Sequence, residues 1–440
     1  MLETKGLMIA APRSGSGKTT VTLGLLRALA RRGMNIGAFK CGPDYIDPAF
    51  HKIATGRSSL NLDSWAMPET MLDSNFMRGC EGADMVIAEG SMGLFDGVAT
   101  RGASGDGASA DIAARFGLPV LLIIDTSGQS QSTGAVAMGF RDFRPDISIA
   151  GVILGNVASE RHRLLAERGC EKAGIKVFGA LPRGGVPSIP ERHLGLVQAE
   201  EIPNVSHVVD TLADAIEKYI DIDAVLAAAI AVQKPVTASK ITLKAPGKHI
   251  ALASDAAFSF TYPHVLANWQ AMGAQILPFS PLANEAPSAD ADCCWLPGGY
   301  PELYLERLAS NHIFMDGLRH FAANKPVHGE CGGYMVLGNH IIDASSKAWN
   351  MAGLLPITTS FAARKLHLGY RALTLAENTL IGEKNMLMRG HEFHYTTITE
   401  QGESTPLGTA TDANGTALGA VGQRVGHVTG SFFHMVACDA

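Results

Sequence analysis

The chain contains no apolar run long enough to cross a membrane. The longest apolar stretch near its N-terminus, residues 7–11, is far shorter than the roughly 20 residues that a transmembrane helix needs. The first five residues also lack the basic segment and following apolar core of a secretory signal. We therefore expect a cytoplasmic protein that makes no membrane contact.

Cysteine and basic charge are also scarce. The seven cysteines are odd in number and include no Cys-x-x-Cys spacing, which argues against a disulfide framework or a zinc knuckle and favours a reducing compartment. The 36 Lys and Arg residues are outnumbered by 42 Asp and Glu residues, for a net charge of −6, and form no long basic run. This composition argues against a nucleic-acid partner.

The sequence does contain enough apolar residues for a large core. Hydrophobic residues make up 46% of the 440 positions and charged residues 18%, a balance typical of folded globular proteins. At roughly 100–200 residues per domain, this length predicts two or three domains. The 48 glycines and 21 prolines fit a loop-rich α/β enzyme.

Short continuous apolar stretches alternate with helical patterns in the first half of the chain. A helix is expected over residues 18–32. Strands are expected at 6–11, 35–40, 85–89, 119–125, 149–154 and 177–181. Continuous rather than alternating apolar runs are typical of strands buried on both faces, so the class is α/β with a doubly wound parallel sheet.

A polar, basic segment interrupts this pattern near residue 240. Residues 234–247 contain prolines and several lysines, and we interpret them as a linker between domains 1–233 and 248–440. The alternation of strands and helices then resumes, with a strand expected at 248–254, a helix near 262–272 and a strand at 275–279. The second domain is therefore also predicted to be doubly wound.

A glycine-rich loop joins the first expected strand to the first helix. Such a loop presents backbone N–H groups and a helix N-terminus to phosphates. The residues expected to bind ATP here are Gly15, Ser16, Gly17, Lys18, Thr19 and Thr20. The usual pattern has Gly where this chain has Pro12, so the loop is a variant. The alternative is a plain Gly/Ser turn, which the strand-loop-helix context disfavours.

Acidic residues at the ends of later strands suggest a metal site for this loop. Asp44 and Asp47 follow the second expected strand, and Glu89 closes the third. Ligands of open α/β sheets bind at such strand ends, and Mg²⁺ prefers oxygen ligands. We predict that Thr19 and these three carboxylates serve Mg²⁺. The alternative for the two aspartates is turn formation beside neighbouring prolines.

A second chemical centre is expected around Cys331. The segment 327–334 has a strand-like start and the form Gly-x-Cys-x-Gly, which is the nucleophile-elbow pattern with Cys in place of Ser. The helix start after Cys331 is expected to favour its thiolate. His434 is the candidate base, although a buried cysteine is often only packing and the chain has 15 histidines.

Glycines around this cysteine are candidates for oxyanion binding. Gly298 and Gly299 end an expected strand in a tight turn, and Gly332 follows the nucleophile directly. Their backbone N–H groups are suited to hold a developing negative charge. We therefore predict a Cys–His centre with these three glycines beside it.

The segment 389–395 carries a further polar cluster. His391, Glu392 and His394 do not have the His-Glu-x-x-His spacing of a helical zinc site. Strand alternation would place Glu392 and His394 on one face and His391 on the other. A substrate-contacting strand is the favoured interpretation, with a solvated strand and a metal site as alternatives.

In these motifs the whole chain resembles the cobyrinate/hydrogenobyrinate a,c-diamide synthases. Its first half looks like the dethiobiotin synthetase fold, and its second half looks like a class I glutamine amidotransferase domain. The resemblance rests on residues 11–20, 40–48, 88–97, 296–303, 328–333, 390–395 and 430–434. These segments cover both expected domains and follow the family order.

The resemblance implies a ligase that uses ATP and glutamine to amidate the a- and c-acetate groups of a corrin ring. Cys331 would attack glutamine with His434 as base, and the released ammonia would attack an acyl phosphate made from ATP. The implied substrates are a corrinoid, glutamine and ATP, with Mg²⁺ as the metal. The resemblance is also compatible with a homodimer. The amino-acid sequence of residues 11–17 is more similar to that of enzymes that use metal-free hydrogenobyrinate.

The resemblance also extends to less certain positions. Asn156 and the Pro182-Arg183 turn would lie near the adenine, and Tyr45 would contact substrate. One departure concerns the catalytic triad, because amidotransferases usually have a Glu two residues after the His, whereas this chain has Val436. We expect a slower or more tightly gated glutaminase.

Two other functions compete with this interpretation. Cobyric acid synthases amidate other side chains of the same ring and share both halves. A partner-switching P-loop ATPase is a more distant alternative, but its signature Lys early in the loop is replaced here by Arg13, and Arg does not substitute simply for Lys.

Overall fold

The computed structural model describes residues 3–187, 189–192, 195–233, 235 and 243–438. The chain divides into two compact units, residues 1–65 with 69–240 and residues 66–68 with 241–440. Of the expected linker 234–247, residues 234 and 236–242 lie outside the described part.

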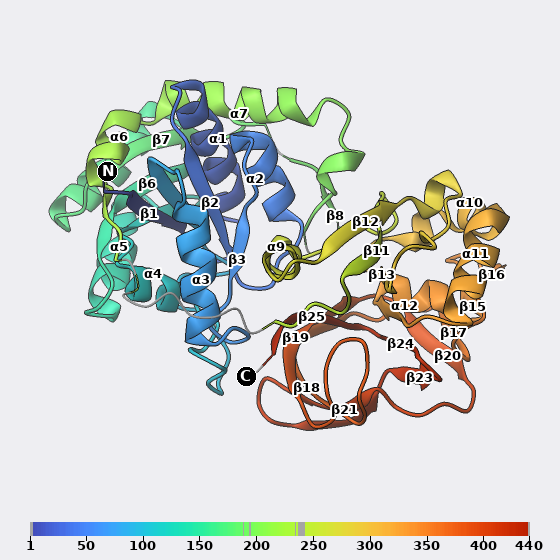
Figure 1. Ribbon diagram of the computed structural model, residues 1–440. Helices are drawn as coiled ribbons and strands as arrows, with labels where there is room; N and C mark the ends of the chain where they lie inside the picture. The colour runs from blue at the N-terminus through green and yellow to red at the C-terminus, as the bar shows by residue number, and fades with distance from the viewer. Residues whose placement is uncertain (1–2, 188, 193–194, 234, 236–242, 439–440) are drawn as a thin grey trace. The chain divides into compact units, whose positions relative to one another are not determined.

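The first unit is built on a parallel sheet flanked by helices (Figure 1). The strand order is β3-β2-β4-β1-β5-β6-β7, all pairs along it are parallel, and β10 pairs antiparallel with β1. The strands are β1 (Lys5–Ala10), β2 (Ile36–Cys41), β3 (Leu60–Leu62), β4 (Met85–Glu89), β5 (Val120–Asp125), β6 (Ile149–Val157), β7 (Val177–Pro182) and β10 (Ile230–Ala231). The short strands β8 (Glu191–Arg192) and β9 (Gly195–Leu196) form a separate pair.

The helices of this unit connect successive strands. They are α1 (Lys18–Arg31), α2 (Asp47–Thr55), α3 (Glu69–Cys80), α4 (Ser109–Phe116), α5 (Ser132–Phe143), α6 (Glu160–Lys172), α7 (Val205–Tyr219) and α8 (Ile222–Ala228). Strands β2 and β4 are buried along their whole length, as continuous apolar runs predict. The expected strands and the helix 18–32 are confirmed; the largest shift is the end of β6, which extends to Val157.

The second unit also contains a mainly parallel sheet, with strand order β12-β11-β13-β14-β24-β23 and only the β23–β24 pair antiparallel. Its strands are β11 (His249–Ala253), β12 (Gln275–Phe279), β13 (Cys293–Leu296), β14 (Val327–Glu330), β23 (Gln423–Val425) and β24 (Val428–Ser431). Its helices are α9 (Pro263–Ala271), α10 (Leu305–Ser310), α11 (His312–Ala322) and α12 (Gly332–Leu337). The predicted α/β class is therefore confirmed for both units.

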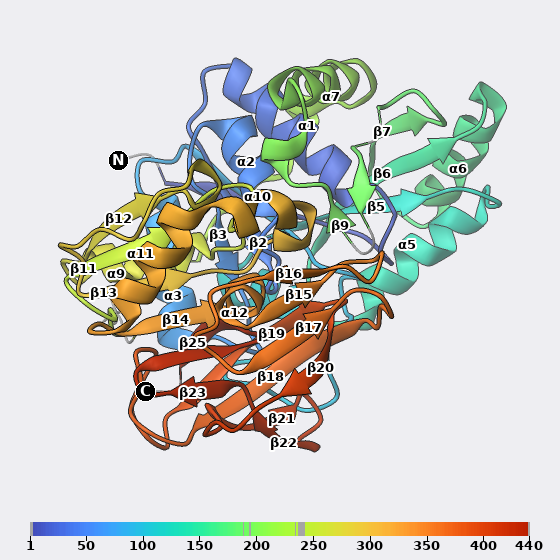
Figure 2. The ribbon, with the colours of Figure 1, turned by 90° about the vertical axis from the view of Figure 1, so that its right-hand side faces the viewer.

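Two further sheets in the second unit were not predicted (Figure 2). One has the order β16-β15-β17-β20, and the other is antiparallel with the order β22-β21-β18-β19-β25. Their strands are β15 (His340–Ile342), β16 (Ala348–Asn350), β17 (Ile357–Ser360), β18 (His367–Leu375), β19 (Leu387–His394), β20 (Thr397–Gln401), β21 (Gly408–Asp412), β22 (Ala417–Val421) and β25 (Phe433–Cys438). The antiparallel sheet matters for function because β25 carries His434.

Two expectations from composition can be compared with the described residues. All seven cysteines are free and buried. Within the described ranges, every helix is too short or too polar to cross a membrane.

Candidate active sites

The loop between β1 and α1 has the shape of a phosphate-binding loop. Gly15 and Gly17 have φ angles of 73° and 91°, a left-handed conformation that favours glycine, and Gly17 is the N-cap of α1. The first turn of α1 contains no acidic residue, so its N-terminus can face an anion. Ser16 closes the loop by donating to the Arg13 carbonyl at 3.0 Å.

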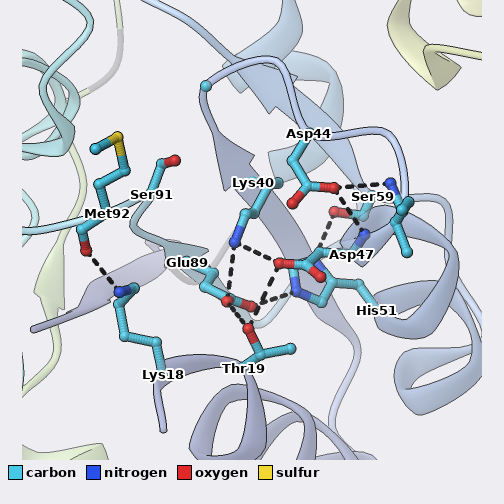
Figure 3. Close-up of polar contacts among 12 residues, drawn as sticks. Lys18, Thr19, Lys40, Asp44, Asp47, His51, Ser59, Glu89, Ser91 and Met92 are labelled. Carbon is cyan, nitrogen blue, oxygen red and sulfur yellow. Dashed lines mark hydrogen bonds and ion pairs between the residues drawn. The ribbon is translucent and has the colours of Figure 1, made fainter. Parts of the chain in front are cut away.

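Lys18 extends across the loop that follows β4. Its Nζ donates to the Met92 carbonyl at 2.5 Å (Figure 3). It also donates to the Arg13 carbonyl at 3.3 Å. Burial, followed by repulsion from Lys40, lowers the pKa of Lys18 to about 8. Because its present partners are neutral carbonyls, the ammonium would gain a charged partner from a bound phosphate.

Glu89 lies at the centre of a buried polar cluster at the end of β4 (Figure 3). Its Oε1 accepts from Thr19 Oγ1 at 2.6 Å and from Lys40 Nζ at 2.9 Å. The Lys40 ammonium also contacts Asp47 Oδ2 at 2.5 Å, and the Thr19 hydroxyl lies 3.5 Å from the same oxygen. The structure therefore brings together three of the four residues expected to serve a metal.

Asp44, the fourth, makes different contacts in this structure, and its role in metal binding stays a prediction. Its Oδ1 accepts from the backbone N–H groups of Ile46 at 2.7 Å and Asp47 at 3.0 Å. This oxygen therefore shapes the turn that leads into α2, which was the alternative interpretation. The neighbouring Tyr45 is buried, with 6% of its surface exposed, so its predicted contact with substrate stays a prediction.

The Lys40 ammonium already supplies one positive charge to this cluster. Burial acts to raise the pKa of Glu89, but Lys40 and His51 together hold it below its ordinary value. Burial would lower the pKa of Lys40, yet Asp47 and Glu89 raise it well above its ordinary value. Burial and the nearby Asp44 raise the pKa of Asp47 to about 8. The oxygen donors are those Mg²⁺ prefers, and the Lys40 ammonium already lies between two of the carboxylates.

Sequence reasoning missed Lys40 and His51. Lys40 is a buried residue of β2, and His51 lies on α2 with 0% exposure. The signal available in the sequence was a lysine inside an apolar strand next to the acidic segment 44–47. Because buried lysines are rarely left unpaired, that position predicts a carboxylate partner.

The predicted adenine-binding residues lie together at the ends of neighbouring strands. Asn156 is near the end of β6 and has a left-handed φ of 56°, while Pro182 is the last residue of β7. The two strands pair through Val157 and Pro182, and the Arg183 N–H donates to the Val157 carbonyl at 2.9 Å. The contact of Asn156, Pro182 and Arg183 with adenine stays a prediction.

Cys331 has the strained geometry that its motif predicts. It lies between β14 and α12 with φ 44° and ψ −102°, an unfavourable conformation for a residue with a Cβ. Its thiol lies 3.7 Å from the Phe393 carbonyl, and its N–H donates to the Ser431 carbonyl at 2.8 Å. Strain of this kind is typical of a nucleophile elbow.

The expectation that the helix start favours a Cys331 thiolate is wrong for this conformation. Burial, followed by the negative charge of Glu302, raises the pKa of the Cys331 thiol well above its ordinary value. The Gly332 N–H acts in the opposite direction but is weaker. A six-residue helix has too little dipole to offset full burial, so a base must remove the proton.

His434, the predicted base, lies near Cys331 across Gly298. A Cβ built on Gly298 would lie 2.4 Å from His434 Cε1 and 3.3 Å from Cys331 Cβ, so this glycine is flanked by both side chains. Burial, followed by repulsion from His391 and His394, lowers the pKa of His434 to about 3. The imidazole is therefore neutral near pH 7, the form in which a ring nitrogen can accept a proton, but the same burial makes it a weaker base than an exposed histidine.

The other two predicted oxyanion residues are also close together. A Cβ on Gly332 would lie 3.0 Å from the Gly299 nitrogen, and a Cβ on Gly299 would lie 2.0 Å from the Ala257 carbonyl. Glycine is therefore required at 299 by close packing alone. The geometry puts the Gly299 N–H near the turn that carries the nucleophile.

Gly298→Ala is expected to reduce glutamine hydrolysis by at least about 100-fold, because its methyl group would displace the His434 ring. Glutamine-dependent and ammonia-dependent product formation, measured side by side, check this effect. The ammonia-dependent rate should not change. Gly139→Ala, on α5 with open space around it, serves as a control for loss of a glycine. An unchanged glutamine-dependent rate in Gly298→Ala would contradict this placement of the base.

The segment around Glu392 forms a polar network rather than a solvated strand. Glu392 Oε2 accepts from Arg371 Nε at 2.5 Å, and its Oε1 lies 2.9 Å from His394 Nε2. Burial would raise the pKa of Glu392, but His394 and Arg371 lower it to about 2. Sequence reasoning missed Arg371 because it lies on β18, opposite Gly390 on the neighbouring strand.

A metal at this network was one sequence alternative. Ligand atoms of His367, Glu392 and His394 lie within 4.8 Å of one another. The carboxylate, however, is already paired with Arg371, and His394 Nδ1 lies 3.0 Å from the Thr396 carbonyl. The network is therefore neutralised by the chain itself, and it holds β19 beside the nucleophile.

His391 lies on the catalytic side of this strand. Antiparallel pairing places it directly opposite His434 on β25, and burial lowers its pKa to about 4. Strand alternation thus separates it from Glu392 and His394, as expected. Contact of these three residues with substrate stays a prediction.

The usual third triad carboxylate has no counterpart two residues after His434. Met435 and Val436 are buried apolar residues on β25. The nearby Glu330 carboxylate instead accepts from the Met435 N–H at 2.9 Å, and burial raises the pKa of Glu330 to about 8. Glu330 therefore fixes the strand that carries His434 rather than the imidazole itself.

Comparisons with known proteins agree with two separate centres. Residues 7–197 match the family model described as a CobQ/CobB/MinD/ParA nucleotide binding domain, and residues 249–439 match a CobB/CobQ-like glutamine amidotransferase domain. Curated proteins named hydrogenobyrinate a,c-diamide synthase are 50% identical in Mesorhizobium japonicum, 49% in Agrobacterium fabrum and 52% in Rhodobacter capsulatus. These matches cover 98–99% of this chain and 99% of each relative.

Proposed function

The chain belongs to the hydrogenobyrinate a,c-diamide synthase family, and on that premise we propose that it amidates the a- and c-acetate carboxylates of hydrogenobyrinate with ATP and glutamine. The observation that carries the proposal is the presence of two candidate chemical centres in one chain. A phosphate loop with Lys18 lies beside Glu89 in one unit, and a strained Cys331 lies beside His434 in the other. Neither centre alone would produce an amide from glutamine.

Glutamine is the nitrogen source in this proposal. His434 takes the Cys331 proton, and the sulfur attacks the carboxamide carbon to form a tetrahedral intermediate. The N–H groups of Gly299 and Gly332, with the Gly298 turn, stabilise its oxyanion. The imidazolium returns the proton to the leaving nitrogen, which departs as ammonia and leaves a glutamyl thioester. Water then hydrolyses the thioester to glutamate and restores the thiol.

The other centre turns a carboxylate into an electrophile. A corrin carboxylate oxygen attacks the γ-phosphorus of ATP, and ADP leaves. Ammonia attacks the resulting acyl phosphate, and inorganic phosphate leaves as the amide forms. Lys18 and the N–H groups of Gly15–Thr20 neutralise charge on the phosphates. Asn156, Pro182 and Arg183 are proposed to bind the adenine end.

A divalent metal fits the residues around Glu89. We propose that Thr19, Asp47 and Glu89 hold Mg²⁺, with Asp44 shaping the adjoining turn. The ion would supply positive charge to the β- and γ-phosphates. The proposed domain assignments are residues 1–233 for amide synthesis, 234–247 as linker and 248–440 for glutamine hydrolysis.

Product mass after incubation with ATP and glutamine is the direct test, with hydrogenobyrinate and cobyrinate supplied in parallel. Two added amides on hydrogenobyrinate are expected. Four added amides would instead support a cobyric acid synthase, and ATP hydrolysis without any amide would support a partner-switching ATPase. A preference for cobyrinate would contradict the metal-free substrate that the names of the relatives favour.

Small-molecule substrates are what the family acts on. A cytoplasmic location, the absence of a nucleic-acid partner, a homodimer and a slow or gated glutaminase stay predictions of the sequence.

A further inference from the structure

His51 connects a buried serine to Glu89. The imidazole lies on α2 with 0% exposure, its Nδ1 2.9 Å from Ser59 Oγ and its Nε2 2.8 Å from Glu89 Oε2 (Figure 3). Ser59 is itself 1% exposed, and Glu89 is fully buried. His51 contacts Oε2 of Glu89, whereas Thr19 and Lys40 both bind the other oxygen, Oε1.

The direction of each hydrogen bond follows from the chemistry of the groups. An ionised carboxylate only accepts, so His51 must donate from Nε2 to Glu89. A neutral imidazole then has its lone pair on Nδ1, which accepts the Ser59 hydroxyl proton. Glu89 therefore selects the tautomer with its proton on Nε2, and the Ser59 hydroxyl, which can donate to the free Nδ1, holds the ring in place.

These hydrogen bonds fix the Glu89 carboxylate in one orientation. His51 occupies Oε2, so Oε1 is the oxygen directed to Thr19 and Lys40, on the side of the phosphate loop. Without that donor, Oε2 would be a buried acceptor with no partner, and the carboxylate would gain by rotating toward Lys40. The position of the oxygen needed for a metal would then be lost.

We propose that His51, fixed by Ser59, is a positioning residue that orients Glu89 for the divalent cation bound with ATP. This inference rests on the proposed function. It adds a residue that does not touch the nucleotide or the corrinoid and acts only through Glu89. Outer residues of this kind typically change metal affinity or activity by about 10-fold to 100-fold.

The test compares His51→Leu with His51→Gln in the full chain. Mn²⁺ serves as the probe, and its binding in the presence of a non-hydrolysable ATP analogue is followed by electron paramagnetic resonance. We expect His51→Leu to weaken Mn²⁺ binding about 10-fold to 100-fold. His51→Gln should recover most of the affinity because its amide can donate to Glu89 Oε2. Ser59→Ala should fall between them, because it removes the hydrogen bond that holds Nδ1 but keeps the imidazole that donates to Glu89.

Phe50→Leu is the matched control, because Phe50 is 1% exposed on the same helix and its side chain has no polar group. It should leave Mn²⁺ affinity unchanged. The inference is overturned if His51→Leu binds Mn²⁺ as the unaltered chain does, or if Phe50→Leu weakens binding equally. Failure of the proposed function looks different: the chain would then make no diamide but would still show His51-dependent binding of Mn²⁺ with the nucleotide.

Steady-state kinetics provide a second readout. Raising the Mg²⁺ concentration should restore much of the lost rate in His51→Leu, because the substitution weakens binding of the cation. A rate that stays low at saturating Mg²⁺, with unchanged Mn²⁺ affinity, would indicate a purely structural role and overturn the inference.

Discussion

Cys331→Ser is expected to abolish glutamine-dependent amide formation while ammonia-dependent formation continues at the original rate. Serine keeps the size of the side chain but replaces the thiol by a hydroxyl that the neutral His434 cannot activate as readily. Removing a nucleophile of this kind costs at least about 10³-fold in rate. The measurement is diamide production with glutamine or with ammonium salt as the nitrogen source.

The structure makes this prediction stringent because Cys331 is fully enclosed. It lies in a strained turn, and its thiol contacts the Phe393 carbonyl rather than solvent. Cys293→Ala removes another buried thiol of the same unit and should leave glutamine use intact. If Cys331→Ser formed product from glutamine at the original rate, the amidotransferase assignment would be lost.

Lys18→Ala is expected to abolish product formation with both glutamine and ammonia. The Lys18 ammonium lies at the phosphate loop, where two backbone carbonyls hold it. Losing a donor that stabilises transition-state charge costs about 10²- to 10³-fold. Acyl phosphate formation should therefore fail whatever the source of nitrogen.

Two controls separate this effect from unfolding. Lys52→Ala removes an exposed lysine from α2 and should retain full activity. Because burial of Lys18 is unfavourable for its charge, its removal should not lower the midpoint of thermal unfolding. Ammonia-dependent activity in Lys18→Ala at the original level would refute phosphoryl activation of the carboxylate.

Much of the fold was predictable because its signals are local. Continuous apolar runs marked strands such as β2 and β4, and Gly15 and Gly17 marked the phosphate loop. The Gly-x-Cys-x-Gly motif predicted the strained turn at Cys331. The two extra sheets of the second unit were missed, since the chain from 340 to 438 pairs strands that are distant in sequence, such as β19 with β25.

The sequence by itself determined the α/β class, the two chemical centres and the residue types that carry them. The tertiary structure decided which charged side chains pair with one another. It brought Lys40 between Asp47 and Glu89, placed His51 behind that carboxylate and paired Arg371 with Glu392. It also raised the pKa of Cys331, against the expectation from its helix. These ion pairs and pKa shifts are set by burial and by partners distant in the sequence. Local spacing does not reveal them, because burial and partners both depend on which strands lie side by side.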